Sequence, residues 1–220
     1  MMYQLFLSVS TKEHRILKIS VYSLKSSFQR LLLPIQNFLI SVNVTPNQIT
    51  LFSCVLCLIY SALLAGSEWT QFLLLILPLV LFVRMALNAL DGMVAQVTNN
   101  TTPIGMVLNE VGDVISDLAL FSAFLVILQI PSSLWWGLII LSLLTEFVSL
   151  AVYQAKNIRS HSGPFGKSDR AVFLGVLAII LVVTPNYPEL IIAYTLSGIL
   201  LASITIFNRF SSLFETSKHA

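Results

Sequence analysis

Six long apolar segments dominate this sequence of 220 residues and restrict what the chain can fold into. Runs of about 20 apolar residues are long enough to cross a bilayer as α-helices. Only 10% of the residues are charged, against about 25% in an ordinary soluble domain, so polar side chains are too few to cover a water-facing surface. Strands of a transmembrane barrel alternate apolar and polar residues, which these segments do not. The composition therefore excludes a soluble enzyme, a disulfide scaffold and a disordered chain, and predicts an all-α integral membrane protein. The six predicted transmembrane helices cover residues 47–66, 70–96, 105–130, 134–155, 168–184 and 189–208.

Basic residues are distributed unevenly between the predicted loops. Eleven of the twelve Lys and Arg residues lie on the side of both termini and the 156–167 connection, the exception being Arg84 inside a span. The connections at 66–69, 131–133 and 185–188 contain no basic residue. Because short cytoplasmic loops are enriched in Lys and Arg, the termini are predicted to be cytoplasmic. With short loops and no recognisable targeting segment, the sequence suits a bacterial inner membrane.

The segment before the first span has its own periodicity. Apolar residues recur there at three- and four-residue spacing, with Lys18, Lys25 and Arg30 off that stripe. This pattern is typical of an amphipathic helix that lies in the membrane interface. We therefore expect three parts: an amino-terminal segment 1–46, a six-helix transmembrane domain 47–210 and a cytoplasmic tail 211–220. The stripe consists of Leu17, Val21, Leu24, Phe28, Leu31, Ile35 and Phe38.

Carboxylates gather at the facing ends of the second and third spans. Asn109, Asp113 and Asp117 are four residues apart and share one helix face, and Asn88 and Asp91 share a face of the preceding helix. The short turn over 97–104 makes these helices antiparallel neighbours, so the two faces can meet. Four acidic residues fall within 27 positions here: Asp91, Glu110, Asp113 and Asp117.

An acidic cluster beside hydrocarbon needs neutralisation, either by a cation or by protons, because burying an ionised carboxylate costs several kcal/mol. Carboxylate and amide oxygens suit a hard cation such as Mg²⁺, Mn²⁺ or Ca²⁺, and Mg²⁺ bound together with substrate phosphates fits best. Small residues at Gly92, Ala95, Gly105 and Gly112 allow a ligand, or another helix, to approach the backbone closely.

These residues form a pattern that resembles the signature of the CDP-alcohol phosphatidyltransferase family. The pattern runs Asn88-x-x-Asp91-Gly92-x-x-Ala95-Gln96, then eight residues to Gly105, three to Asn109 and three to Asp113. The family signature reads Asp-x-x-Asp-Gly-x-x-Ala-Arg with the same later spacing to Gly, Asp and Asp. This chain therefore has Asn88 and Asn109 where the family has aspartates, and Gln96 where it has arginine. The Thr45-Pro46-Asn47-Gln48-Ile49-Thr50 segment is similar to the one that opens the family's first span.

The resemblance implies a reaction and a set of site residues. It implies that an alcohol displaces CMP from a CDP-diacylglycerol-type lipid with the help of Mg²⁺ or Mn²⁺, in phospholipid biosynthesis. Asp113 would be the general base as well as a metal ligand. The resemblance also favours a homodimer, and no nucleic acid partner is expected. The remaining metal ligands would be Asn88, Asp91 and Asn109, with Asp117 as a compensating ligand, and the nucleotide would be lined by Asn47, Thr50, Gly92, Ala95 and Gly105.

The 156–170 connection brings further cations to the side of the carboxylates. Arg159, Lys167 and Arg170 are suited to bind a phosphate on the acceptor alcohol, such as glycerol 3-phosphate, and ordinary positive-inside bias is the alternative explanation. Arg84 could face the carboxylates, hold the diphosphate or pair with Asp91, and Glu146 could serve either packing or catalysis.

Two other readings stay open. The replacements at Asn88, Asn109 and Gln96 also fit a catalytically silent family member that acts as a membrane scaffold or binds lipid. An ion or proton transporter would use intramembrane acids as a relay, but it predicts charges near the midplane and internal repeats. The acids here lie near one surface, and the two halves of the sequence do not match.

Overall fold

The structure is a computed structural model that describes residues 27–157 and 162–214. Six long helices follow one another along this part of the chain: α2 (Pro46–Gly66), α3 (Thr70–Val97), α4 (Pro103–Ile127), α5 (Ser132–Lys156), α6 (Lys167–Val183) and α7 (Pro188–Ser211). Their bounds agree with the six predicted segments within three residues. The structure therefore confirms the all-helical fold class in the described residues.

The starts of α2, α4 and α7 follow from their local chemistry. At α2, the Thr45 hydroxyl accepts from the Gln48 backbone N–H while the Gln48 side chain accepts from the Thr45 N–H, which is a capping box. Proline occupies the first position of α2, α4 and α7, where a missing N–H costs nothing.

The end of α4 differs from the prediction, which carried this helix to residue 130. The helix ends at Ile127, and Leu128 already has an extended ψ of 130°. Pro131 contributes to this end, because a proline disfavours a helical conformation of the residue before it, so the helix could not have continued through Ile130.

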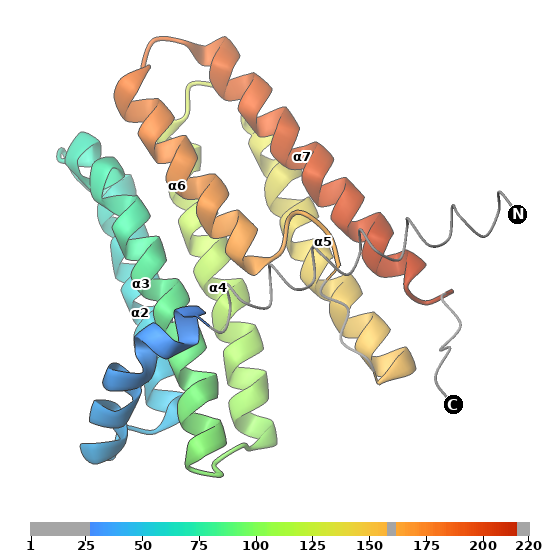
Figure 1. The fold of residues 1–220 in the computed structure, drawn as a ribbon. Coiled ribbons are helices and arrows are strands. Elements are labelled where there is room, and N and C mark those ends of the chain that lie inside the picture. The colour runs from blue at the N-terminus through green and yellow to red at the C-terminus, as the bar shows by residue number, and fades with distance from the viewer. Residues whose placement is uncertain (1–26, 158–161, 215–220) are drawn as a thin grey trace, which may run out of the picture.

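The helices pack side by side as a bundle of near-parallel and antiparallel rods (Figure 1). Helix α2 packs on α3 and α4, α3 also packs on α6, and α5 packs on α4 and α7. One apolar core joins the six helices, and within it Trp135 donates from Nε1 to the Phe121 carbonyl oxygen at 2.8 Å. The ring of Phe173 stacks on Tyr194 with centroids 4.4 Å apart and closes α6 on α7.

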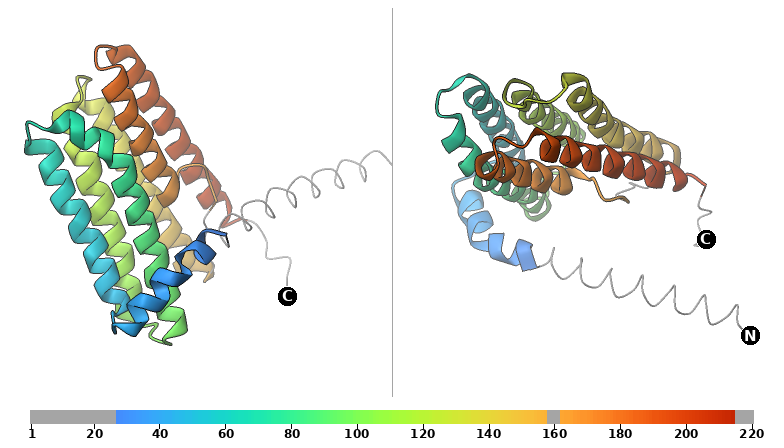
Figure 2. Two further views of the ribbon diagram at one scale, coloured as in Figure 1. Left: turned by 60° about the vertical axis from the view of Figure 1, so that its left-hand side comes forward. Right: turned by 90° about the horizontal axis from the view of Figure 1, so that it is seen from above.

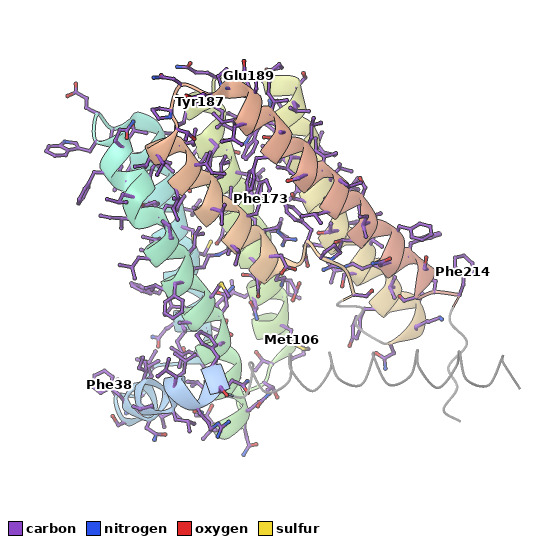
Figure 3. The ribbon with its side chains drawn as sticks, turned by 45° about the horizontal axis from the view of Figure 1, so that its top comes forward. Phe38, Met106, Phe173, Tyr187, Glu189 and Phe214 are labelled. Atoms are coloured by element: carbon purple, nitrogen blue, oxygen red, sulfur yellow. The ribbon has the colours of Figure 1, made fainter. Side chains whose placement is uncertain are left out.

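Successive helices run in opposite directions, so their ends gather at two opposite ends of the bundle. The amino ends of α2, α4 and α6 share one end of the bundle with the carboxyl ends of α3, α5 and α7 (Figure 1). In Figure 3, Phe38 and Met106 mark this end, and Tyr187 and Glu189 mark the opposite end, with Phe173 between them. All residues of the proposed site come from the first set of ends.

A shorter helix over 27–41 crosses that same end of the bundle instead of running along it (Figure 2). Leu32 and Gln36 are buried, and Gln36 Nε2 donates to the Met93 carbonyl oxygen at 3.0 Å, which fixes this helix on α3. Leu31, Ile35 and Phe38 of the predicted stripe are exposed. The rest of that stripe before residue 27 lies outside the described residues, so the interfacial helix stays a prediction.

Four of the helices are long and apolar enough to span a membrane: α2, α3, α5 and α7. The other two predicted spans do not meet the same criterion. Helix α4 carries Glu110, Asp113 and Asp117 within its 25 residues, and α6 has 17 residues. The two helices that do not meet it are those that bring most of the charged groups to the site.

Candidate functional site

The site begins where α2 meets the last turns of α3. Asp91 is buried, with 3% of its surface exposed, and its Oδ2 accepts a hydrogen bond from Thr50 Oγ1 at 2.8 Å. The other oxygen, Oδ1, is buried and has no hydrogen-bond partner. A buried carboxylate oxygen without a donor points to a group that the protein itself does not supply.

Asn88 connects this carboxylate region to α4. Its Oδ1 accepts from Ser53 Oγ at 3.1 Å, and its Nδ2 donates to Asp113 Oδ1. The side chains of the predicted α3 face therefore meet those of the α4 face, as the short 97–104 turn predicted. Asn109 lies one turn before Asp113 and is half-buried.

Asp113 is held by a cation from the beginning of α6. Lys167 Nζ lies 2.8 Å from Asp113 Oδ2 and 3.1 Å from Glu110 Oε2, so one ammonium group bridges two carboxylates. Arg84 Nη2 donates to the Asp113 backbone carbonyl at 3.2 Å and lies 3.6 Å from its Oδ1. Arg84 thus faces the carboxylates of α4, and the described residues contain no ion pair between Arg84 and Asp91.

Asp117 lies one turn deeper, between two guanidinium groups. Arg84 Nη1 lies 2.6 Å from its Oδ1, and Arg170 Nη2 lies 2.7 Å from its Oδ2. Both carboxylate oxygens therefore have cationic partners from the chain itself. Position on the Asn109–Asp113 face suggested a compensating metal ligand; the contacts present describe a buried ion pair.

The ion pairs continue through the bundle to α5 and α7. Arg170 Nη1 lies 3.0 Å from Glu146 Oε1, and Arg209 Nη1 lies 3.4 Å from the same oxygen. Glu146 therefore pairs with two arginines of α6 and α7. The burial of Arg209, which is 3% exposed, was not predicted, because its place after the last span indicated only a residue of the topology count.

Small residues occupy the signature positions Gly92, Ala95 and Gly105. A Cβ added to Gly105 would lie 2.8 Å from Asn47 Oδ1, so only glycine lets the Asn47 side chain approach α4 there. A Cβ added to Gly92 would meet nothing within 4 Å, and Gly92 is exposed. Ala95 is half-buried one turn further along. Arg159 of the predicted phosphate-binding set lies outside the described residues.

The donor set limits which cation can bind. Within residues 27–157 and 162–214, no three His, Cys, Asp or Glu side chains are grouped so as to hold a metal ion. A cation at this place would need amide oxygens beside the free oxygen of Asp91. Carboxylate and amide oxygens together fit a hard divalent cation, and they do not fit a soft metal.

Comparison with known proteins identifies the pattern. The family model described as CDP-alcohol phosphatidyltransferase matches residues 43–207. The chain belongs to this family. It is thus an enzyme of the CDP-alcohol phosphatidyltransferase class, and the matched range includes Asn47, Thr50 and the whole signature from Asn88 to Asp113.

The relatives of this phosphatidyltransferase agree with a membrane protein. It is 42% identical over 170 residues to the inner membrane protein YnbA of Escherichia coli, covering 77% of this chain and 84% of that protein. It resembles the phosphatidylinositol phosphate synthase of Mycobacterium tuberculosis with CDP-DAG bound, with a TM-score of 0.68, 18% identity and coverage of 86% and 96% of the two chains. The same synthase with manganese and citrate matches with a TM-score of 0.68 and 18% identity over 84% and 90% of the two chains. The chain shares its fold with this synthase. Its four long apolar helices and its similarity to an inner membrane protein show that the phosphatidyltransferase is a multi-pass membrane protein.

Proposed function

We propose that the protein transfers a phosphatidyl or related phospho-alcohol group from a CDP-linked lipid to an acceptor alcohol and releases CMP. The observation that carries this proposal is the meeting of Thr50, Asp91, Asn88 and Asp113 across α2, α3 and α4, at the positions of the family signature. The Mycobacterium tuberculosis synthase that shares this fold has CDP-DAG bound, which supports the choice of lipid.

The reaction requires one bond to form and one to break. The acceptor hydroxyl oxygen bonds to the phosphorus of the lipid phosphate, and the bond from that phosphorus to the bridging diphosphate oxygen breaks. CMP leaves with the bridging oxygen and its electron pair. Asp113 takes the hydroxyl proton: its two oxygens accept from Asn88 and Lys167, and each oxygen keeps a second lone pair for this purpose.

We propose Asn88, Asp91 and Asn109 as the ligands of a divalent cation, Mg²⁺ or Mn²⁺, with Asp113 beside it. The buried Asp91 Oδ1 supports this assignment because it is a strong acceptor that lacks a donor. A bound cation would supply charge stabilisation for the diphosphate. Asp117 is not in the proposed ligand set, since Arg84 and Arg170 occupy both of its oxygens.

The residues beside the cation have separate proposed roles. Asn47, Thr50, Gly92, Ala95 and Gly105 would line the nucleotide, which the open space at Gly92 supports. Lys167 would bind a phosphate on the acceptor, such as glycerol 3-phosphate, because 30% of its side chain is exposed and its ammonium lies beside the proposed base. Arg170 is 1% exposed and tied to Asp117 and Glu146, so its proposed role changes from binding the acceptor to holding α6 in place.

We further propose six membrane spans, with α4 and α6 as the two that carry the charged groups. The active site would then face the cytoplasm of a bacterial cell, because the basic residues of the described part gather at the same end as Asp113. The name of YnbA as an inner membrane protein supports this location. A homodimer remains a proposal from the family resemblance.

Release of CMP tests the proposed reaction directly. Protein purified in detergent, given a CDP-diacylglycerol, Mg²⁺ and a panel of phosphorylated and unphosphorylated alcohols, is expected to release CMP with at least one alcohol. EDTA and Asp113→Asn are each expected to abolish this release. Glu189→Gln makes the same chemical change at the opposite end of the bundle and is the matched control (Figure 3). No CMP with any alcohol, and no thermal stabilisation by the CDP-lipid with Mg²⁺, would contradict the proposal.

A lipid-binding protein without turnover is the second candidate function. It is favoured by the two amides at signature positions and by the Lys167 ammonium that already pairs with Asp113. This candidate predicts that the CDP-lipid raises the melting temperature while no alcohol on the panel yields CMP. The same two measurements therefore separate the two functions.

A further inference from the structure

The carboxylates at this end of the bundle differ in whether the chain neutralises them. In the part of the chain that the structure describes, Glu110 and Asp113 share Lys167, and Asp117 and Glu146 share Arg170. Arg84 and Arg209 add a second cation to Asp117 and Glu146, respectively. Four acidic side chains therefore face four basic ones, and this group of eight is neutral as a whole.

Asp91 stands outside this balance. It forms no ion pair within residues 27–157 and 162–214, although it is almost completely buried, with only 3% of its surface exposed. Its only side-chain donor in the described structure is the neutral Thr50 hydroxyl at 2.8 Å, and Oδ1 has no partner. A buried ionised carboxylate is costly without a compensating charge, so Asp91 is the carboxylate of this end that has room for a cation from outside the chain.

We infer that the site binds one divalent cation, on Asp91, and that the Lys167 ammonium group occupies the place at Asp113 where a second cation would bind. This inference rests on the proposed function, since it concerns the ligands of the same reaction. It concerns the number of ions and the group that substitutes for one of them.

The contacts of Asp113 oppose a second metal ion. One oxygen has an ammonium at 2.8 Å, and a divalent cation there would have to displace Lys167 or lie next to its positive charge. Repulsion between like charges at such short range is strong near a protein surface and stronger inside. Lys167 is also shared with Glu110 at 3.1 Å, so the ammonium is held from two sides.

The orientation of Asn88 adds an independent argument. Its oxygen faces Ser53, and its nitrogen donates to Asp113 Oδ1. An amide NH₂ group is a donor without ligand capacity, so the side of Asn88 that faces Asp113 cannot share a cation with it. An aspartate at position 88 would present an oxygen to that side, and the family signature has one there.

Counting bound Mn²⁺ tests the inference without relying on turnover. Purified protein in detergent is titrated with Mn²⁺, and free Mn²⁺ is measured from its electron paramagnetic resonance signal. The wild type is expected to bind one ion per chain, and Asp91→Asn is expected to bind none. A wild type that binds two ions, or an Asp91→Asn variant that still binds one, would overturn the inference.

A matched pair of triple variants tests the role of Lys167. Asn88→Asp/Asn109→Asp/Lys167→Met restores two carboxylates and removes the ammonium, so it is expected to bind two Mn²⁺ with a spectrum broadened by coupling between neighbouring ions. Asn88→Asp/Asn109→Asp/Lys167→Arg keeps a cation and is expected to bind one. Equal stoichiometry in the two variants would contradict the substitution by Lys167. Melting temperatures establish that both variants are folded, and the wild-type count stands whether or not they are.

Failure of the inference and failure of the proposed function give different results. Two Mn²⁺ per chain together with CMP release would overturn the single-cation site and leave the phosphatidyl transfer intact. One Mn²⁺ on Asp91 without CMP release from any alcohol would leave the cation site intact and remove the transfer reaction.

Discussion

Arg170 directs two nitrogens at one oxygen of Asp117: Nε lies at 2.8 Å and Nη2 at 2.7 Å from Oδ2. This contact ties the beginning of α6 to α4, in the helix that also carries Asp113. Because Lys167 lies one turn before Arg170, the same contact fixes where the Lys167 ammonium can reach.

Removing this buried cation is expected to destabilise the protein. Arg170→Met would leave Asp117 and Glu146 each with one guanidinium partner fewer, and breaking one side of a buried ion pair costs about 3–5 kcal/mol. Reversible unfolding by SDS in mixed micelles measures the loss. Arg170→Lys keeps the charge but loses the two-nitrogen contact, so an intermediate loss is expected. An unfolding midpoint unchanged in Arg170→Met would show that this contact contributes no stability.

Thr50 is expected to act on the cation through Asp91. Thr50→Val keeps the shape of the side chain and removes the hydrogen bond to Asp91 Oδ2, so the carboxylate loses the group that orients it. Loss of such a partner typically weakens metal affinity by about 10- to 100-fold. The dissociation constant of Mn²⁺ measures the effect, and Thr50→Ser is expected to retain near-wild-type affinity. Equal affinity in Val and Ser variants would mean that the hydrogen bond does not position Asp91.

The absence of a side chain at Gly105 is expected to matter for the position of the Asn47 side chain and not for the stability of the helix. A methyl group in Gly105→Ala would lie 2.8 Å from Asn47 Oδ1 and 3.1 Å from Thr102 Oγ1, so the Asn47 side chain must turn away. The KM for the CDP-lipid is expected to rise, while the melting temperature stays within a few degrees because the displaced atom ends a flexible side chain. Gly66→Ala, where an added Cβ meets nothing within 4 Å, is the control and is expected to leave the KM unchanged.

Lys167 is expected to distinguish the two substrates. Its ammonium lies beside the proposed base Asp113, and 30% of the side chain is exposed. Lys167→Ala is therefore expected to raise the KM for a phosphorylated acceptor by about 10-fold or more, the size of a lost charge-assisted hydrogen bond, and the KM for the CDP-lipid much less. Steady-state CMP release with each substrate varied in turn measures both values. Equal increases in the two KM values would contradict a role in acceptor binding.

Several features of the fold could be predicted from the sequence because they depend on neighbouring residues. Apolar runs, prolines at first helical positions and the Thr45–Gln48 capping box define where α2 to α7 begin. The 97–104 turn is too short to allow anything but an antiparallel pair, so the meeting of Asn88 and Asp113 also followed. The prediction failed at the end of α4, where apolarity continues beyond Ile127 but the backbone before Pro131 leaves the helix.

The partners of the charged residues could not be predicted in this way. Arg170 and Asp117 are 53 positions apart, and Arg209 and Glu146 are 63 apart. From sequence position, Asp117 was predicted to be a metal ligand, and Arg209 was counted only as a basic residue on the side of the termini. Periodicity describes one helix at a time and contains no information on which helices touch.

The sequence by itself determined a helical membrane protein, the approximate positions of its helices and a signature with two aspartates and two asparagines. These depend on the hydrophobicity and spacing of residues along one chain segment. Only the tertiary structure decided which carboxylates the chain neutralises and which it leaves open. Arg84, Lys167 and Arg170 arrive from α3 and α6 to pair with α4, and Asp91 alone among the described carboxylates of the site receives no cation. Electrostatic pairing acts over a few ångströms in space whatever the separation along the chain, so packing of the helices had to come first.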